Sequence, residues 1–248
     1  MIENLIRFYG RRKGKPIRNI RAELMEKLLP QLSVQIPAKG KIKFNFGIRP
    51  KKLYLEVGFG GGEHLAELAL KHPDIGFVGA EPFLNGVASL LAHLSDTHEK
   101  GVGKIALSPN RTDNVRIWPD DVRQLFEKLP DEIFEGIFVL YPDPWPKKRH
   151  AERRFIGPDN IPELWRLLSP KGKVYLATDV ENYAAWAKEK MDESQIFTQV
   201  HSDIFVPPKD WVPTRYELKG IAAGRSPIYM IFQKKEKKLK KNLTNPKK

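Results

Sequence analysis

Short apolar runs alternate with amphipathic stretches from residue 53 onward, and this alternation predicts the fold class. Apolar runs bounded by Gly, Lys or Pro indicate buried strands, and apolar residues at helical spacing follow them. The expected strands are 53–57, 76–81, 114–118, 136–141 and 172–178, and the expected helices are 63–71, 84–94, 122–129, 160–168 and 183–191. Strands that alternate with helices favour an α/β fold with one doubly wound, mainly parallel sheet.

Two further apolar runs, 196–200 and 228–232, close this pattern as strands. No helix of ordinary length is expected between them. We therefore expect these two strands to form an antiparallel pair at one edge of the sheet.

Charge divides the chain into three parts. The net charge of +13 separates into +11 over residues 1–52, −5 over 53–233 and +7 over 234–248. We expect a basic, partly flexible arm over 1–52, with one helix near 21–29 stopped by Pro30, one domain over 53–233, and a disordered Lys-rich tail over 234–248. A loop is expected over 101–113. Cationic ends recruit polyanions such as nucleic acid, although a Lys-rich tail is also typical of a simple solubilising extension.

Composition excludes several classes of protein. The chain has no cysteine, so disulfides, thiolate metal sites and cysteine nucleophiles are excluded. No apolar run approaches the ~20 residues that span a bilayer, and no secretory signal is evident, so we expect a cytoplasmic protein without membrane contact. The six histidines show no metal-ligand spacing, and we expect no metal.

Acidic residues stand at the carboxyl end of each expected parallel strand, where ligands of such sheets bind. They are Glu56, Glu81, Asp120 with Asp121, Asp143 and Asp179. Glu56 precedes a glycine loop, Gly58 to Gly62, whose spacing differs from the dinucleotide fingerprint, and its charge would repel a diphosphate. Glu81 follows Gly58 by 23 residues, the position of an acid that binds ribose hydroxyls. Together they favour a nucleoside with a cationic appendage, S-adenosylmethionine; the alternative is a Gly-rich turn with solvated acids.

The string from Tyr141 to His150 follows the most apolar strand and combines three prolines, an acid, an indole and a basic cluster. Prolines make the loop stiff, so it loses little entropy on ordering. An aromatic ring can stack on a purine while a carboxylate accepts from the N–H groups of guanine, and adjacent cations hold phosphates. The alternative is a rigid loop with Trp145 packed in the core.

The sequence resembles bacterial tRNA (guanine-N7)-methyltransferases over residues 53–233. The motifs that carry this resemblance are Leu55-Glu56-Val57-Gly58-Phe59-Gly60, Glu81, Asp121, Pro142-Asp143-Pro144-Trp145-Pro146-Lys147-Lys148-Arg149-His150, Ala177-Thr178-Asp179 and Thr214-Arg215-Tyr216-Glu217. The resemblance implies a Rossmann-like class I methyltransferase fold of about seven strands. It also implies methyl transfer from S-adenosylmethionine to N7 of a guanine in the variable loop of tRNA.

The resemblance implies roles for particular residues. Cofactor contacts are expected from Glu56, Gly58, Gly60, Glu81, Asp121 and Asp143, where counting favours Asp121 over the adjacent Asp120. Substrate contacts are expected from Lys147, Asp179, Thr214, Arg215, Tyr216 and Glu217. The tRNA phosphates are expected to meet Lys148, Arg149, Arg153 and Arg154.

Guanine N7 carries a lone pair and no proton, so it needs no general base. Catalysis then rests on in-line placement and on fixed acids near the moving positive charge. We expect Asp143 to be the central catalytic residue, with Asp179 and Glu217 holding the base edge or a nearby ribose.

Two other functions are also compatible with the sequence. An amino-methyltransferase acting on adenine or cytosine carries a related Asp-Pro-Pro-Tyr loop, from which Pro142-Asp143-Pro144-Trp145 differs in order. A noncatalytic RNA-binding protein with a Rossmann-like body is the second. A dehydrogenase is disfavoured by the glycine spacing and by Glu56. No obligate protein partner is evident.

Overall fold

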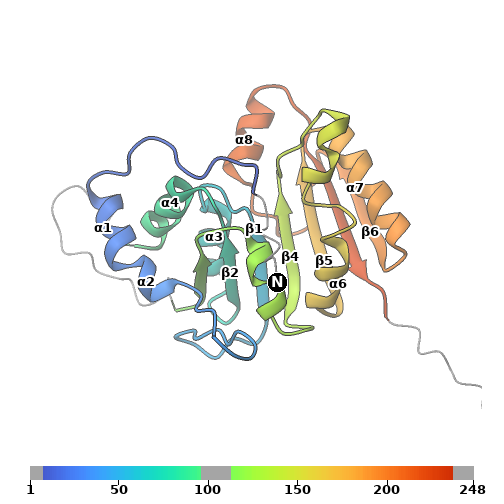
Figure 1. Ribbon diagram of the computed structural model, residues 1–248. Coiled ribbons are helices and arrows are strands. Elements are labelled where there is room, and N and C mark those ends of the chain that lie inside the picture. The colour runs from blue at the N-terminus through green and yellow to red at the C-terminus, as the bar shows by residue number, and fades with distance from the viewer. Residues whose placement is uncertain (1–7, 96–112, 237–248) are drawn as a thin grey trace, which may run out of the picture.

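A single twisted sheet organises the computed structural model, which describes residues 8–95 and 113–236 (Figure 1). Its seven strands follow the order β3-β2-β1-β4-β5-β7-β6. The strands are β1 (Leu53–Val57), β2 (Gly76–Ala80), β3 (Val115–Trp118), β4 (Phe134–Leu140), β5 (Leu168–Thr178), β6 (Phe197–Ile204) and β7 (Ile228–Lys234). Strands β1 to β5 pair in parallel, which confirms the doubly wound, mainly parallel sheet.

Helices follow most strands, as the apolar spacing predicts. They are α1 (Ile20–Lys27), α2 (Leu29–Leu32), α3 (Glu63–Lys71), α4 (Leu84–Leu94), α6 (Ile161–Leu167), α7 (Glu181–Ser194) and α8 (Arg215–Ala222). Two 3-10 helices, η1 (Val122–Lys128) and η2 (Lys148–Arg153), complete the described elements. The helix expected over 122–129 is therefore the tighter 3-10 form, which Asp121 begins by accepting a hydrogen bond from the Arg123 amide.

The antiparallel pair expected at one edge is confirmed. Strand β7 runs antiparallel to both β5 and β6 and lies between them, so β6 is the edge strand. The connection between β6 and β7 also contains α8, a helix that the sequence reading missed. Because that connection is 23 residues long, it can return above the carboxyl ends of the strands, where α8 lies in Figure 1.

Two apolar clusters cover the two faces of the sheet. Alternate residues of β4 show this directly, since Val139 belongs to one cluster while Phe138 and Leu140 belong to the other. The first cluster joins the sheet to η1, α6 and α7, and the second joins it to α1, α2, α3 and α4. The central parallel strands are therefore covered on both faces, as is typical of parallel sheets, whereas alternate residues of the edge strand β6 are exposed.

Part of the expected N-terminal arm contributes to this core. Leu24 of α1, Leu28 between the two helices and Leu32 of α2 are buried in the second cluster, four residues apart. Pro30 does not stop the helical region, because it lies in the first turn of α2, where its missing amide is tolerated. The boundary at residue 52 stays a prediction about how the chain divides.

The Lys-rich tail begins inside the sheet. Lys234 ends β7 and is 5% exposed, and its ammonium lies 3.0 Å from a Glu132 carboxylate oxygen. The remaining tail beyond residue 236, and residues 96–112 of the expected loop over 101–113, lie outside the described residues.

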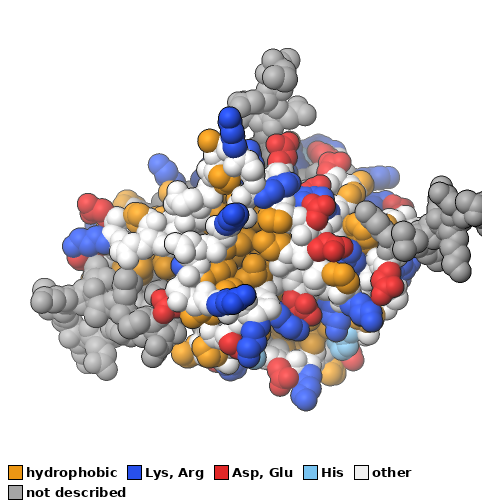
Figure 2. Space-filling model, turned by 90° about the horizontal axis from the view of Figure 1, so that it is seen from below, with side chains coloured by type: hydrophobic (Ala, Val, Ile, Leu, Met, Phe, Trp, Pro, Cys, Tyr) orange, Lys and Arg blue, Asp and Glu red, His pale blue; other side chains and the backbone are white. Residues whose placement is uncertain are grey.

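The described part of the chain has no helix with the length and apolarity needed to cross a membrane. Seen from below in Figure 2, Lys and Arg side chains are interspersed with Asp and Glu. That face therefore presents no field of a single sign.

Candidate active site

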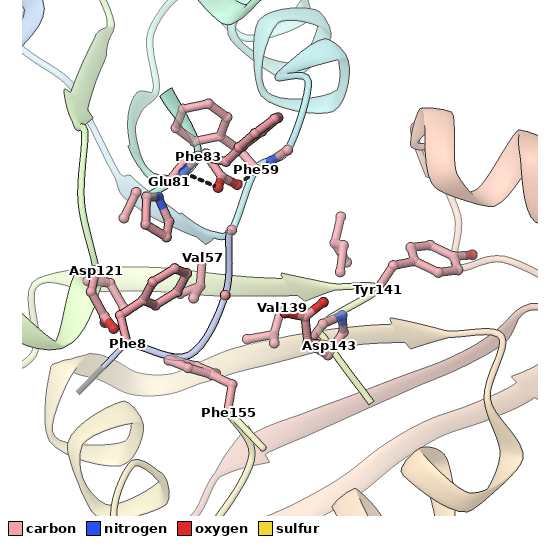
Figure 3. A pocket seen from close by; sticks show the side chains of 18 of the residues that line it. Phe8, Val57, Phe59, Glu81, Phe83, Asp121, Val139, Tyr141, Asp143 and Phe155 are labelled. Atoms are coloured by element: carbon pink, nitrogen blue, oxygen red, sulfur yellow. Dashed lines mark hydrogen bonds between the residues drawn. The ribbon is translucent and has the colours of Figure 1, made fainter. Parts of the chain in front are cut away.

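A cavity of about 520 Å³ opens beyond the carboxyl ends of β1 to β4 (Figure 3). The six residues predicted to contact the cofactor all line it, namely Glu56, Gly58, Gly60, Glu81, Asp121 and Asp143. Its volume lies in the range of small-molecule sites. The parallel register brings these residues together, since four strand ends meet at one edge of the sheet.

The glycine loop needs glycine at positions where the backbone is left-handed. Gly58, Gly60 and Gly62 have φ of 69°, 58° and 79°. Helix α4 also packs closely on this loop and needs glycine at the contact. A Cβ at Gly86 would lie only 2.1 Å from the Gly60 carbonyl oxygen. A Cβ at Gly58 would meet nothing within 4 Å, so the backbone there is open to a ligand.

Glu56 is buried at the floor of the cavity and has a partner that the sequence reading missed. Its Oε2 lies 2.8 Å from Nδ1 of His64 on α3, and both side chains are at most 3% exposed. The His64 ring packs edge-on against Phe138, with 5.0 Å between the ring centroids. The pair therefore fixes the Glu56 carboxylate, since a buried acid is costly without a hydrogen-bonded partner.

Glu81 ties the glycine loop to the start of α4. Its two carboxylate oxygens accept hydrogen bonds from the backbone amides of Gly60 and Phe83, at 2.7 and 2.8 Å. Burial nevertheless opposes its charge and raises the pKa of Glu81 to about 7. The remaining lone pairs can accept hydroxyl donors from a ribose.

The adjacent acids Asp120 and Asp121 have different surroundings, which separates their roles. Asp121 is 6% exposed, lines the cavity, and accepts hydrogen bonds from the Arg123 guanidinium, the shortest at 2.6 Å. Asp120 instead pairs with Arg12 at 2.8 Å. Burial opposes ionisation of Asp120, but hydrogen bonds from Arg12 and from the Asp121 amide outweigh it and lower the pKa of Asp120.

The loop that carries Asp143 is strained at both ends. Tyr141 and Trp145 have φ of 50° and 42°, a left-handed region that bulky residues rarely adopt. Arg154 holds this shape, because its guanidinium donates to the carbonyl oxygens of Pro144 and Trp145 at 2.9 and 3.2 Å. Such strain persists only where the surrounding structure enforces it, and here it aims Asp143 at the cavity.

Arg154 is therefore placed differently from the phosphate contact that the sequence reading expected. It is 9% exposed and also packs over the Trp186 ring, 4.9 Å from its centroid. Arg153 lies instead between the rings of Tyr9 and Trp145, at 4.3 and 5.1 Å from their centroids. Asp143, Lys147, Lys148 and Arg149 are exposed.

The Thr214-to-Glu217 motif builds the start of α8. The Thr214 hydroxyl accepts a hydrogen bond from the Glu217 amide, which makes Thr214 the N-cap. Glu217 is 3% exposed and accepts from Trp211 and from Tyr229, the latter at 2.7 Å. Burial and the charge of Glu217 together raise the pKa of Tyr141 far above its ordinary value.

The structure separates the expected substrate residues into two groups. Thr214, Tyr216 and Arg153 line the cavity, whereas Lys147, Lys148, Arg149, Arg154, Asp179, Arg215 and Glu217 do not. Asp179 is held by Arg225, 2.5 Å from its Oδ2. Four further lining residues come from the expected basic arm, for which the sequence predicts no place at the cavity, namely Phe8, Tyr9, Gly10 and Arg11.

Comparison with known proteins agrees with this geometry. A family model described as "Putative methyltransferase" matches residues 50–230. The solved structure of the 16S rRNA methyltransferase KamB is similar with a TM-score of 0.54 at 12% identity, covering 76% of this chain and 90% of that one. An antibiotic-related methyltransferase is similar with a TM-score of 0.50 at 15% identity, covering 88% and 96%. The strand order and the acid-lined cavity thus define a class I methyltransferase.

Curated relatives narrow this class further. The chain is 41% identical over 237 residues to a tRNA (guanine-N7)-methyltransferase of Rhodospirillum rubrum, covering 92% of this chain and 88% of the relative. It is 42% identical to the enzyme of the same name from Paramagnetospirillum magneticum, covering 92% and 93%. The chain belongs to the tRNA (guanine-N7)-methyltransferase family.

Methyltransferases of this class use S-adenosylmethionine, and the residues of the cavity fit that group. Three buried acids, Glu56, Glu81 and Asp121, suit a cationic ligand with ribose hydroxyls and an amino group on its base. The left-handed Gly58 leaves room for close approach to the backbone.

Proposed function

We propose that this protein transfers a methyl group from S-adenosylmethionine to N7 of a guanine in the variable loop of tRNA. The proposal rests on the fact that two different sites lie next to each other. A buried cavity walled by acids opens beside an exposed loop on which Asp143 precedes Lys147, Lys148 and Arg149. A cationic methyl donor suits the first site, and an RNA suits the second.

Each acid of the cavity has a distinct task in this proposal. Glu56, fixed by His64, faces the charged amino-acid end of the donor. Glu81 accepts from the ribose hydroxyls, and Asp121, fixed by Arg123, accepts from the base. When bound, S-adenosylmethionine supplies an electrophilic methyl group.

The loop after β4 positions the guanine. Asp143 is exposed at the cavity, so its carboxylate is free to accept from the N–H groups on the Watson–Crick edge of the base. This contact orients N7, whose lone pair attacks without loss of a proton. Orientation of this kind contributes ~7–11 kcal/mol to the most favourable bimolecular reactions, and a fixed negative charge near the forming purine cation adds to it.

The exposed cations bring the RNA to the site. Lys147, Lys148 and Arg149 contact phosphates, which gives binding that weakens as salt rises. Arg215 and Tyr216, exposed on α8 on the other side of the cavity, extend this surface. We place the reaction in the cytoplasm, because a tRNA substrate is found there.

Atomic substitution in the RNA tests the proposed nucleophile. Transcripts of one tRNA are made with guanosine or with 7-deazaguanosine, in which a carbon replaces N7, and each is incubated with radiolabelled S-adenosylmethionine. We expect label in the first transcript and none in the second. Equal labelling of both transcripts would contradict the proposal and favour an amino-methyltransferase.

A further inference from the structure

The chain before α1 crosses the carboxyl ends of the strands and reaches the cavity (Figure 1). We call residues 8–15 the N-terminal segment. Phe8, Tyr9, Gly10 and Arg11 line the same cavity as the acids. Figure 3 shows the Phe8 ring beside Asp121 and Val57.

Four polar contacts tie the N-terminal segment to the part of the sheet that carries Glu81 and Asp121. Arg12 pairs with Asp120 through both terminal nitrogens, at 2.8 and 2.9 Å. The Leu84 amide donates to the Arg12 carbonyl at 3.0 Å. Asn85 accepts from the Gly14 amide at 2.8 Å and donates to the Lys15 carbonyl at 2.7 Å. These contacts anchor the segment to the start of α4 and to the loop after β3.

The local sequence also fixes the Phe8 ring. The Arg12 guanidinium lies over this ring, 5.3 Å from its centroid. Gly10 is required for the same arrangement, because a Cβ there would lie 2.5 Å from Cζ of Phe8. Any side chain at residue 10 would therefore displace the ring.

We propose that the N-terminal segment forms the outer wall of the adenosine end of the cavity, with Phe8 stacking on the purine and the Arg12–Asp120 pair holding the wall. This inference rests on the proposed function, because it takes S-adenosylmethionine as the ligand. In the proposed function Glu81 binds the ribose, and Asp121, which follows the next strand β3, binds the base. The Phe8 ring lies beside Asp121. A purine has two apolar faces, and an aromatic ring is the side chain best suited to cover one of them.

Calorimetric binding of S-adenosylhomocysteine to the full-length protein tests the wall without requiring catalysis. Phe8→Ala is expected to weaken binding about tenfold, since base–aromatic stacking contributes ~1–3 kcal/mol. Phe8→Trp keeps a stacking face and is expected to bind within about threefold of wild type. Gly10→Ala removes no side chain from the lining but displaces the Phe8 ring, and should also weaken binding. Phe205→Ala is the matched control, because Phe205 is 56% exposed and lies away from the cavity.

The ion pair gives a second, independent test. Arg12→Gln and Asp120→Asn each remove one partner of a half-exposed pair, and each is expected to weaken binding about threefold. The double variant should bind about as well as the weaker single variant, because both substitutions remove the same contact.

The outcomes separate this inference from the proposed function. If wild-type protein binds neither S-adenosylmethionine nor S-adenosylhomocysteine, the proposed function is wrong. If wild type binds and Phe8→Ala and Gly10→Ala bind equally well, the wall is wrong while the function stands. Tighter binding by Phe8→Ala would also overturn it, because the ring would then occupy the place of the purine. Thermal melting of each variant shows whether it is folded. If Phe8→Ala does not fold, the binding affinity of Arg12→Gln tests the wall instead.

Discussion

The two halves of the active site differ in how completely the protein satisfies its own polar groups. In the donor half, at the ends of β1, β2 and β3, each acid is buried and held by a neighbour: Glu56 by His64, Glu81 by two amides and Asp121 by Arg123. In the proposed guanine half, after β4, Asp143 and the cations of the loop face solvent. In the proposed function, a small ligand therefore binds a preformed site, whereas a large RNA binds a rigid loop whose polar groups are exposed.

Removing the exposed acid should have the largest effect on chemistry. Asp143→Ala is expected to lower the single-turnover rate with saturating tRNA and donor about 10²–10³-fold, the cost typical of one lost electrostatic contact in a transition state. Affinity for S-adenosylhomocysteine should change far less. Asp192→Ala, at an exposed site on α7, is the control. A near-wild-type rate for Asp143→Ala would show that the open half does not position the base.

Glu81, in the donor half, should make the free energy of unfolding of the protein depend on pH. Its folded pKa of about 7 lies above the ordinary value of 4.5, so the folded state keeps a proton that the unfolded state has lost. The stabilisation is complete below about pH 4.5 and is lost as pH rises through 7, a change of about 3 kcal/mol.

Denaturant unfolding of wild type and Glu81→Gln from pH 4.5 to 8, without ligand, measures this effect. The free energy of unfolding of wild type minus that of Glu81→Gln should fall across that range, because Glu81 loses its proton and Gln cannot ionise. A difference that is constant with pH would show that Glu81 does not titrate with a raised pKa in the folded protein. Burial of this acid would then cost less than we infer.

His64 tests whether the buried acids need their partners. His64→Ala leaves the Glu56 carboxylate buried without its hydrogen bond and is expected to lower the free energy of unfolding by about 2–3 kcal/mol. His93→Ala, at a partly exposed position on α4, should cost less than about 1 kcal/mol. Equal losses of unfolding free energy in the two variants would show that the buried Glu56 does not depend on its hydrogen bond with His64.

The smallest effects should come from the exposed cations of the loop. Lys147→Ala and Arg149→Ala are each expected to raise KM for tRNA a few-fold and to reduce the slope of log affinity against log salt by about one. Affinity for S-adenosylhomocysteine should stay unchanged, as it should in the control Lys71→Ala on α3. A loss of donor affinity in the loop variants would mean that the two halves are not separable.

The sequence predicted best what depends on local pattern. The strand at 53–57 and the helices at 63–71 and 84–94 begin and end where the structure has them, because their apolar spacing and flanking Gly or Pro are strong local signals. The acids were predicted to meet because parallel strands place their carboxyl ends at one edge.

What the sequence could not predict depends on contacts between distant residues. The hold of Arg12 on Asp120 joins positions 108 residues apart, so nothing near Phe8 indicates that it lines a cavity. Arg154 belongs to the same basic run as Arg149, and composition treats them alike, yet one holds loop carbonyls and the other is exposed. Helix α8 was missed because its apolar residues are few and several of them, including Tyr216 and Leu218, are exposed.

Transfer of the methyl group to guanine N7 is best tested by mass-spectrometric nucleoside analysis of unmodified tRNA, after incubation with the full-length protein and S-adenosylmethionine. We expect 7-methylguanosine as the methylated product, at one position of the variable loop, and its near absence with Asp143→Ala. Methylated adenosine or cytidine in its place, or no methylated nucleoside at all, would show that guanine N7 is not the acceptor.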